Sequence, residues 1–387
     1  MKNKKICILS FSNIKRDSRV LREINTFKEK YSLVVIGYGD WENSDNLNFI
    51  KLSKTKRNLL FFLKYSFFLI FGKFCPFLYE KAYWIKKEYK QAMNILLSQD
   101  FDLIHANDWD ALPLSIFATK KKITKVLFDT HEYTPEQGIE NILIEIFVKP
   151  YKTFLLSKYI RECQYAITVS PKIAALYKKN MKVRMETILN APYYIRSNLN
   201  PIDESKINII HHGAAVPERH LEEMIKLVQL LDERFFFNFL LISNSNSNYL
   251  KKLKRDAQKI APGRITFYDP IAPNEIVNFI NQFDLGLPFI KVKGLNFLYS
   301  LPNKFFDFIM AGLGVIINPL PAMEEIVKKY NIGKVAISDS ITDIAKLINS
   351  LEGEDIYNFK NNSLQLAKII NAENEMNKLE NIYNKIL

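Results

Sequence analysis

Apolar strand patterns and helical patterns alternate along almost the whole chain, and this alternation constrains the fold more than any other feature. The first strand is expected at residues 6–11, a helix at 20–30 and a second strand at 32–37. This order predicts a βαβ unit, in which a helical crossover joins two parallel strands. Later apolar runs, each followed by a loop and a helical pattern, extend the same sheet at residues 103–106, 126–129 and 166–169.

A polar segment with two prolines, "NAPYYIRSNLNPIDESK" at 190–206, interrupts the alternation and predicts a linker. The pattern then restarts with a strand at 207–213 and a helix at 221–231. Further strands are expected at 237–242, 265–268, 285–288 and 315–317, with a helix at 249–259. The second half of the chain is therefore predicted to be another α/β layer structure.

Two domains are expected from the length, because 387 residues exceed what one hydrophobic core usually holds. We predict the α/β class, with two doubly wound, Rossmann-like domains that face a central cleft, at residues 1–195 and 196–360. Residues 361–387 predict a polar C-terminal helix that could cross back onto the first domain. Ligands of such sheets bind at the carboxyl ends of the strands, so functional residues are sought there.

Composition limits the partners. The net charge of +13 suits nucleic acid, an anionic membrane surface or a phosphate-bearing substrate. The abundance of Lys, Ile and Asn is typical of an AT-rich genome, however, and the sequence has neither a basic low-complexity tail nor an RNA-binding aromatic motif, so no nucleic acid is expected. The three widely spaced cysteines predict neither disulfides nor zinc, and the apolar run after "MKNKK" is too short for a secretory signal. The cytoplasm is the expected compartment.

One lysine in an apolar segment raises the question of a ligand. The segment "SLPNKFFDFIMAGLGVIINP" (300–319) predicts a helix at 305–311, which Pro302 and Asn303 begin, followed by a buried strand. Lys304 therefore lies in the first helical turn, where the helix dipole disfavours a cation. It is either a solvated capping residue or an anion-binding residue, because an anion there would contact free backbone N–H groups and the ammonium together.

A second basic residue follows the first strand of the second half. In "HHGAAVPERHLEEMI" (211–225), Gly213 allows the backbone to approach a ligand, and Arg219 offers a planar guanidinium suited to phosphate oxygens. Taken alone, Arg219 is better interpreted as an ordinary surface arginine. Because Arg219 and Lys304 both lie at strand-to-helix junctions of one domain, the pair indicates an anion site.

These two segments resemble the donor-nucleotide domain of retaining glycosyltransferases with the GT-B fold, family 4, also called glycosyl transferase group 1. In the first half, "RDSRVLREI", "DLIHANDWDALP" and "FDTHEYTPE" resemble the polysaccharide-building members of that family. The motifs span nearly the whole chain in the expected order. The resemblance implies that the first domain binds the acceptor and the second binds a nucleotide-sugar donor.

For the donor, the resemblance implies that Arg219 and Lys304 clamp the diphosphate without a metal or another cofactor, with Gly213 and Asn303 beside them. Asp307 matches the second of two family acids, which holds the ribose hydroxyl groups, but its side chain is one methylene shorter.

The first family acid falls on Tyr299, so a carboxylate that contacts the donor sugar is missing. This departure bears on the identity of the sugar and on the activity.

For the transfer step, His131 in "DTHEY" matches a first-domain histidine that lies near the reacting sugar in relatives, and we predict a catalytic role for it beside Arg219 and Lys304. The alternative is a structural histidine bonded to a loop carbonyl. Asp108 and Glu132 follow strand ends and are expected on the acceptor side.

Two other features invite a metal interpretation. The pair Asp108 and Asp110 in "NDWD" looks like the metal-binding acids of a different glycosyltransferase fold, but it follows a strand of the acceptor domain, so we predict no metal. His105 has no partner at zinc spacing and is expected to be structural.

The segment at 57–90, "RNLLFFLKYSFFLIFGKFCPFLYEKAYWIKKEYK", has the most unusual composition. It combines Phe, Leu and Tyr with scattered lysines, and its apolar runs are far shorter than the ~20 residues that span a bilayer. Two interpretations stay open. The segment contacts an anionic membrane surface, or its helices pack under the sheet while the lysines extend to water. The phenylalanines concerned are Phe61, Phe62, Phe67, Phe68 and Phe71.

Together these observations predict a hexosyltransferase-type enzyme that moves a sugar from a nucleoside diphosphate sugar to a glycan or lipid-linked acceptor, retaining the anomeric configuration. The expected setting is bacterial surface polysaccharide, capsule or lipopolysaccharide assembly, in the cytoplasm or on the inner face of the cytoplasmic membrane. Two alternatives are a nucleotide-sugar epimerase of the same fold and a non-catalytic partner subunit. Tyr299 and Asp307 favour the non-catalytic subunit.

Overall fold

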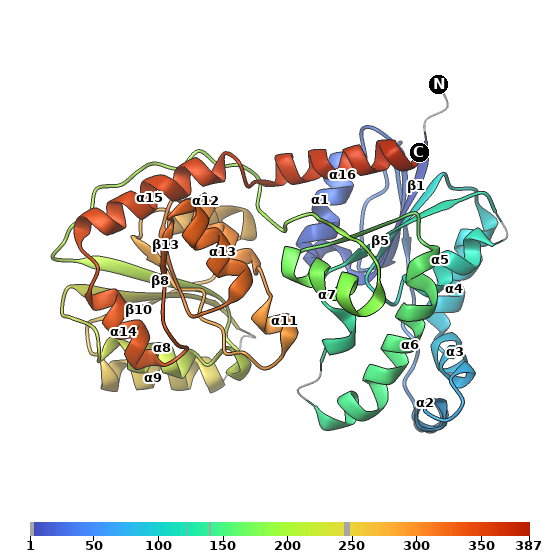
Figure 1. The fold of residues 1–387 in the computed structure, drawn as a ribbon, viewed down its shortest axis with the longest axis horizontal. Helices are drawn as coiled ribbons and strands as arrows, with labels where there is room; N and C mark the ends of the chain where they lie inside the picture. Colours follow the sequence, from blue (N-terminus) through green and yellow to red (C-terminus); the bar gives the residue numbers. More distant parts are fainter. Residues whose placement is uncertain (1–3, 121, 139–140, 244–247) are drawn as a thin grey trace. The chain divides into compact units, whose positions relative to one another are not determined.

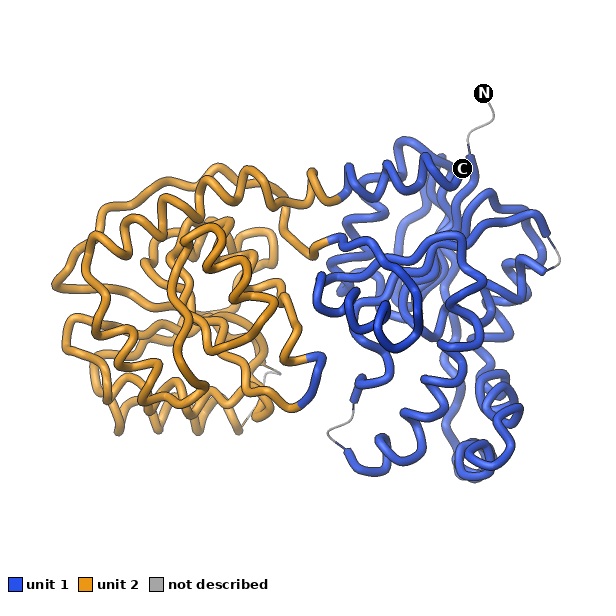
Figure 2. The backbone as a smooth tube through the Cα atoms, in the orientation of Figure 1, with its two compact units in different colours: residues 1–188, 294–296, 376–387 blue, residues 189–293, 297–375 orange. Residues whose placement is uncertain are grey.

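Residues 4–120, 122–138, 141–243 and 248–387 are described by the structure, a computed structural model, and they form two α/β units (Figures 1 and 2). Unit 1 comprises residues 1–188, 294–296 and 376–387, and unit 2 comprises residues 189–293 and 297–375. The units meet in the sequence at 188/189 and 375/376, whereas the sequence patterns suggested boundaries after residues 195 and 360.

Unit 1 is built on a parallel sheet of seven strands in the order β3-β2-β1-β4-β5-β6-β7. The residues from Ile6 to Ser10 are all buried, because helices cover both faces of the sheet. The strands are β1 (Lys5–Asn13), β2 (Ser32–Tyr38), β3 (Leu47–Lys51), β4 (Leu103–Asn107), β5 (Lys125–Thr130), β6 (Tyr165–Thr168) and β7 (Glu186–Thr187).

The helices of unit 1 connect these strands. Asp17 begins the first of them, since its side chain accepts a hydrogen bond from the Val20 N–H at 3.2 Å. They are α1 (Ser18–Phe27), α2 (Leu59–Gly72), α3 (Phe77–Trp84), α4 (Lys87–Ser98), α5 (Leu112–Thr119), α6 (Lys149–Tyr159) and α7 (Pro171–Met181).

Unit 2 repeats the architecture with a parallel sheet of six strands in the order β10-β9-β8-β11-β12-β13. Its strands are β8 (Ile207–Ala214), β9 (Phe235–Ile242), β10 (Ile265–Tyr268), β11 (Leu285–Gly286), β12 (Gly314–Ile317) and β13 (Gly333–Val335). Its helices are α8 (Leu221–Val228), α9 (Asn248–Ile260), α10 (Ile276–Ile280), α12 (Asn303–Met310), α13 (Pro321–Tyr330), α14 (Ile341–Asn349) and α15 (Gly353–Ala367), and the short α11 (Leu295–Leu298) precedes α12.

The C-terminal segment is two helices rather than the single predicted one. After α15 ends, α16 (Ala372–Ile386) begins, because the Asn371 side chain accepts a hydrogen bond from the Asn374 N–H at 2.9 Å and so caps the new helix. The apolar side of α16 belongs to the core of unit 1, to which it contributes Met376, Leu379, Ile382, Tyr383 and Ile386.

A buried hydrogen bond also joins α16 to the sheet of unit 1. The Tyr383 hydroxyl lies 2.7 Å from Nδ1 of His105 on β4, and both side chains are fully buried. We expect Tyr383→Phe to lower the free energy of unfolding by about 1 to 3 kcal/mol, because it leaves a buried ring nitrogen without its partner.

The three tryptophans, Trp41, Trp84 and Trp109, all lie in unit 1, so tryptophan fluorescence during denaturant titration measures the unfolding of that unit. Ile123→Ala is the control, because Ile123 lies in unit 1 and is fully exposed. Equal unfolding midpoints for the two variants would contradict the prediction.

Candidate active site

The carboxyl end of β8 lies where the strand order of unit 2 changes direction. β8 pairs with β9 on one side and with β11 on the other, and both pairs are parallel. In doubly wound sheets such a point is where ligands bind. Gly213 lies at this end of β8, and Lys304 lies in the first turn of α12.

Gly213 and Lys304 are in direct proximity. Gly213 has a φ of +138°, and a Cβ atom there would lie 3.3 Å from Lys304 Nζ. Any other residue would therefore strain the backbone and crowd the amine. Lys304 is only 7% exposed, so the alternative of a solvated capping lysine is wrong.

A histidine that the sequence motifs did not single out orients the Lys304 amine. His211 Nδ1 lies 2.7 Å from the Leu287 carbonyl oxygen, which can only accept, so Nδ1 carries the proton. The other ring nitrogen, Nε2, then accepts a hydrogen bond from Lys304 Nζ at 3.1 Å. Burial and the Lys304 charge hold the pKa of His211 far below its usual value, so the ring stays neutral. Two histidines at the end of an apolar strand, directly before a glycine, were the available sequence signal.

The Lys304 amine is held in an unfavourable electrostatic position. Burial and the Arg219 charge lower its pKa from 10.5 to about 7, although Asp307 acts in the opposite direction. Because the folded pKa lies below the unfolded one, this lysine costs folding free energy, and the cost grows as the pH falls from 10.5 to about 7. Stability therefore does not explain its position, and an anion beside the amine would offset the cost.

Arg219 supplies the second cation. It ends a short 3-10 helix, Pro217–Arg219, and its guanidinium is half-buried, which lowers its pKa. Within the described ranges its side chain makes no hydrogen bond or ion pair.

The remaining predicted donor residues lie around these two cations. Asp307 Oδ2 is 3.4 Å from His212 Nε2, and burial and the Lys304 charge lower the pKa of His212 to about 3, so this is no ion pair at neutral pH. Asn303 is exposed and accepts a hydrogen bond from Asn190. Tyr299 is part-buried in the segment before α12. Unit 2 thus brings Gly213, Arg219, Lys304 and Asp307 together.

In unit 1, His131 and Asp108 form a second group at the ends of β5 and β4. Asp108 has a φ of +63°, and its Oδ1 accepts from the His131 N–H at 3.1 Å while Oδ2 lies 3.4 Å from His131 Nδ1. His131 Nε2 lies 3.2 Å from Asn107 Oδ1, so both ring nitrogens face side chains rather than the loop carbonyl that the structural alternative required. Glu132 is exposed. Burial alone would lower the pKa of His131, but the Asp108 and Asp129 carboxylates outweigh it and raise that pKa.

Beneath His131 lies a buried charge cluster. Arg19 on α1 forms a bidentate pair with Asp129 on β5, at 2.6 Å for Nε and 3.0 Å for Nη2. Its Nη1 also donates to the Ile188 carbonyl oxygen at 2.8 Å. Burial would raise the pKa of Asp129, but the guanidinium holds it well below the usual range. Glu23 accepts from Asn107 Nδ2 at 3.2 Å, which links the cluster to the residue that holds His131.

The cluster includes a set of possible metal ligands. One oxygen or nitrogen atom each from Glu23, His105 and Asp129 lies within 4.8 Å of the others. The Arg19 guanidinium already occupies both Asp129 oxygens and supplies the positive charge, so these residues do not fit a metal ion. The sequence signal for the cluster was Arg19 and Glu23 at positions i and i+4, on the same helix stripe as buried Phe27.

Comparisons with known proteins agree with this architecture. Residues 56–191 match the family model described as Glycosyltransferase Family 4. Comparison with curated protein sequences finds no match. Among solved structures, HepE of Anabaena in complex with UDP and glucose is similar at 12% identity, with 98% of this chain and 99% of that chain covered and a TM-score of 0.67.

Two other solved structures are similar over their whole length. A glycosyltransferase of Rickettsia africae has 12% identity, coverage of 100% of this chain and 99% of that chain, and a TM-score of 0.68. Sucrose-phosphate synthase of Thermosynechococcus elongatus has 12% identity, 99% coverage of both chains and a TM-score of 0.70. The family model and the shared fold confirm the resemblance to GT-B glycosyltransferases and the α/β fold class predicted from the sequence.

The Lys304 environment makes anion binding depend on pH. A bound diphosphate favours charged Lys304, so binding above the pKa of about 7 requires uptake of a proton. We expect the affinity for UDP-glucose to be constant below that pH and to fall above it, by at most about tenfold per pH unit. Calorimetric titration at a series of pH values measures this, and UDP-glucose is suitable because its diphosphate does not titrate in that range.

Lys304→Met is the matched variant. It should weaken binding by about 1.5 to 3 kcal/mol and remove the pH dependence. Its melting temperature should stay equal to or above that of the wild type, since a buried amine is replaced by an apolar chain of similar length. A pH-independent wild-type affinity would rule out Lys304 as the titrating contact.

Proposed function

We propose that this chain, which carries a glycosyltransferase family 4 domain within a GT-B fold, transfers a sugar from a nucleoside diphosphate sugar to a glycan or lipid-linked acceptor with retention of anomeric configuration. One observation carries the proposal. Lys304 is buried beside Gly213, at the strand switch point of unit 2, at a cost to stability, and the charge of a second cation, Arg219, acts on its amine. A diphosphate is the ligand chemistry that offsets this cost.

The same residues give the proposed chemistry. Charge develops on the diphosphate as the bond to the sugar breaks, and Arg219 and Lys304 stabilise it electrostatically without a metal. Asp307 accepts hydrogen bonds from the ribose hydroxyl groups. A UDP-sugar is the donor class we propose, because the similar HepE structure is a complex with UDP and glucose. Asp108 and Glu132 lie on the acceptor side.

The two alternatives are distinguished by one assay. Incubating the protein with a panel of nucleotide sugars, with and without acceptor extracts, shows acceptor-dependent transfer for a glycosyltransferase and an altered free nucleotide sugar for an epimerase. Binding without any turnover identifies a non-catalytic subunit. The presence of Tyr299 in place of the first family acid favours this alternative. Either of the last two results contradicts the proposed function.

His131 generates the prediction for the transfer step. Its pKa is raised and its ring is 21% exposed, so it presents a protonatable group in unit 1. We expect His131→Ala to lower kcat by ~100-fold or more while the donor affinity changes little, because the interaction acts mainly in the transition state. Steady-state kinetics and calorimetry separate the two quantities. His220→Ala is the control, since His220 lies in unit 2 and has no assigned role. Unchanged turnover in His131→Ala would remove His131 from the catalytic residues.

We further propose that the protein works at the inner face of the cytoplasmic membrane in surface polysaccharide, capsule or lipopolysaccharide assembly. The support is α2, in which only Leu69 and Gly72 are buried. Of the five phenylalanines in the alternative of a helix packed under the sheet, Phe62, Phe67 and Phe71 are exposed, which contradicts that alternative for them, whereas Phe61 and Phe68 are part-buried. Its exposed apolar residues are Leu59, Leu60, Phe62, Leu63, Phe67, Ile70 and Phe71. Among the described residues, no helix has the length and apolarity needed to cross a bilayer.

Vesicle flotation tests this contact. We expect the protein to float with anionic vesicles at low salt and less with neutral ones, because apolar side chains enter the interface while each nearby lysine contributes about 1 kcal/mol. Leu60→Ser combined with Phe71→Ser should abolish flotation. Ile123→Ser is the control, because Ile123 is a fully exposed apolar residue elsewhere in unit 1. No flotation of the wild type with either vesicle would refute the contact.

A further inference from the structure

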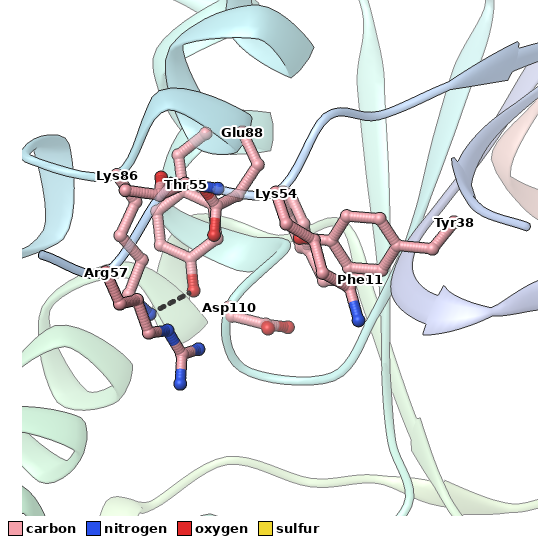
Figure 3. Close-up of a pocket in the computed structure, with 9 residues that line it drawn as sticks. Phe11, Tyr38, Lys54, Thr55, Arg57, Lys86, Glu88 and Asp110 are labelled. Atoms are coloured by element: carbon pink, nitrogen blue, oxygen red, sulfur yellow. Dashed lines mark hydrogen bonds between the residues drawn. The ribbon is translucent and has the colours of Figure 1, made fainter.

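Unit 1 contains a pocket of about 540 Å³ that the sequence motifs did not indicate. It lies at the carboxyl ends of two neighbouring strands, where Phe11 of β1 and Tyr38 of β2 line it (Figure 3). Lys86, beside the first turn of α4, and Asp110, beyond β4, complete its walls.

The lining of the pocket is cationic. Three bases, Lys54, Arg57 and Lys86, line it against two acids. Glu88 is buried and already accepts a hydrogen bond from the Thr55 N–H at 3.1 Å. The other acid, Asp110, has its pKa raised to about 7 by burial and by the Asp108 charge, which favours the uncharged carboxyl.

Figure 3 shows how the pocket is divided. The Arg57 guanidinium and the Lys86 ammonium lie on one side of the Asp110 carboxyl, and Lys54, Phe11 and Tyr38 lie on the other. Lys86 Nζ donates to the Tyr89 hydroxyl at 2.8 Å, and burial lowers the pKa of Lys86. An anion beside Arg57 would offset this desolvation penalty of Lys86, because a negative charge favours the charged form of the amine.

An apolar groove of about 650 Å³ lies next to the pocket along the chain. Leu63 and Phe67 of α2 form one side, and Trp84 at the end of α3 lies on the other. The groove and the pocket share the turn between α3 and α4, where Ile85 lines the groove and Lys86 lines the pocket. The charged residues that line the groove, Lys64, Lys81 and Lys90, are all bases.

We propose that the pocket and the groove bind one molecule, an anionic amphiphile whose phosphate headgroup lies against Arg57 and Lys86 and whose hydrocarbon chain lies in the groove. The inference rests on the proposed function and names the class of its acceptor. Neighbouring cationic and apolar sites that share a turn match the two parts of such a molecule. The Asp110 carboxyl and the aromatic side of the pocket are then left for sugar hydroxyl groups and a sugar ring attached to the phosphate.

The test compares three soluble probes below their micelle concentrations. Dodecyl phosphate carries both parts, dodecyl maltoside carries the chain without the charge, and inorganic phosphate carries the charge without the chain. We expect dodecyl phosphate to bind at least about tenfold more tightly than either other probe, since charge-assisted hydrogen bonds and chain burial add. Calorimetry measures the affinity, and Trp84 fluorescence reports occupation of the groove.

Variants of each part make the test specific. Arg57→Gln should lower the affinity for dodecyl phosphate about tenfold and leave dodecyl maltoside unchanged. Leu63→Ser combined with Phe67→Ser should weaken both amphiphiles, and the fold should tolerate it because these side chains are 61% and 50% exposed. Lys179→Gln and Ile123→Ser are controls, since both are exposed in unit 1 and line neither the pocket nor the groove.

Three results would overturn the inference. They are equal affinities for the two amphiphiles, an unchanged affinity in Arg57→Gln, and adsorption to vesicles without binding of monomeric dodecyl phosphate. UDP-glucose binding to the same samples separates the two proposals. Normal donor binding without amphiphile binding rejects only the acceptor class, whereas a wild type that binds no nucleotide sugar rejects the proposed function.

Discussion

The bidentate pair between Arg19 and Asp129 is the interaction on which the functional end of unit 1 depends. It joins the first helix to the fifth strand, and the same guanidinium holds the chain at Ile188, where unit 1 gives way to unit 2. A buried charge that loses its partner costs several kcal/mol. The pair therefore holds α1, β5 and the chain at Ile188 together. His131 follows Asp129 by two residues, and its ring contacts Asn107, which also donates a hydrogen bond to Glu23 of the same cluster.

Unit 2 contains a buried cation that is paired in the same way, since Lys360 Nζ donates to Asp284 Oδ1 at 2.9 Å. Lys304 differs, because it contacts a neutral imidazole and the Arg219 charge lowers its pKa. The charge cluster around Arg19 is therefore neutralised internally, whereas the Lys304 amine keeps an unfavourable position that a bound anion would offset. This contrast supports the proposed acceptor and donor roles of the two units.

Much of this followed from the sequence. The central strands form near the predicted positions, because parallel strands buried on both faces give continuous apolar runs. The short edge strands β3 and β13 gave no such pattern, and the break between α15 and α16 depends on one asparagine cap. Arg219 and Lys304 were recognisable at strand-to-helix junctions. The pairing of Arg19 with Asp129 and of His105 with Tyr383 was not, since these partners are 110 and 278 residues apart and no local pattern relates them.

The path of the chain also bears on how the protein folds as it is synthesised. Unit 2 comprises residues 189–293 and 297–375 and is therefore translated before most of α16 (Ala372–Ile386), yet α16 supplies part of the core of unit 1. A nascent chain can therefore complete unit 2 while the first sheet still has an uncovered apolar face. Unit 1, although translated first, reaches its final packing last, and until then the exposed face is a target for chaperones and for aggregation.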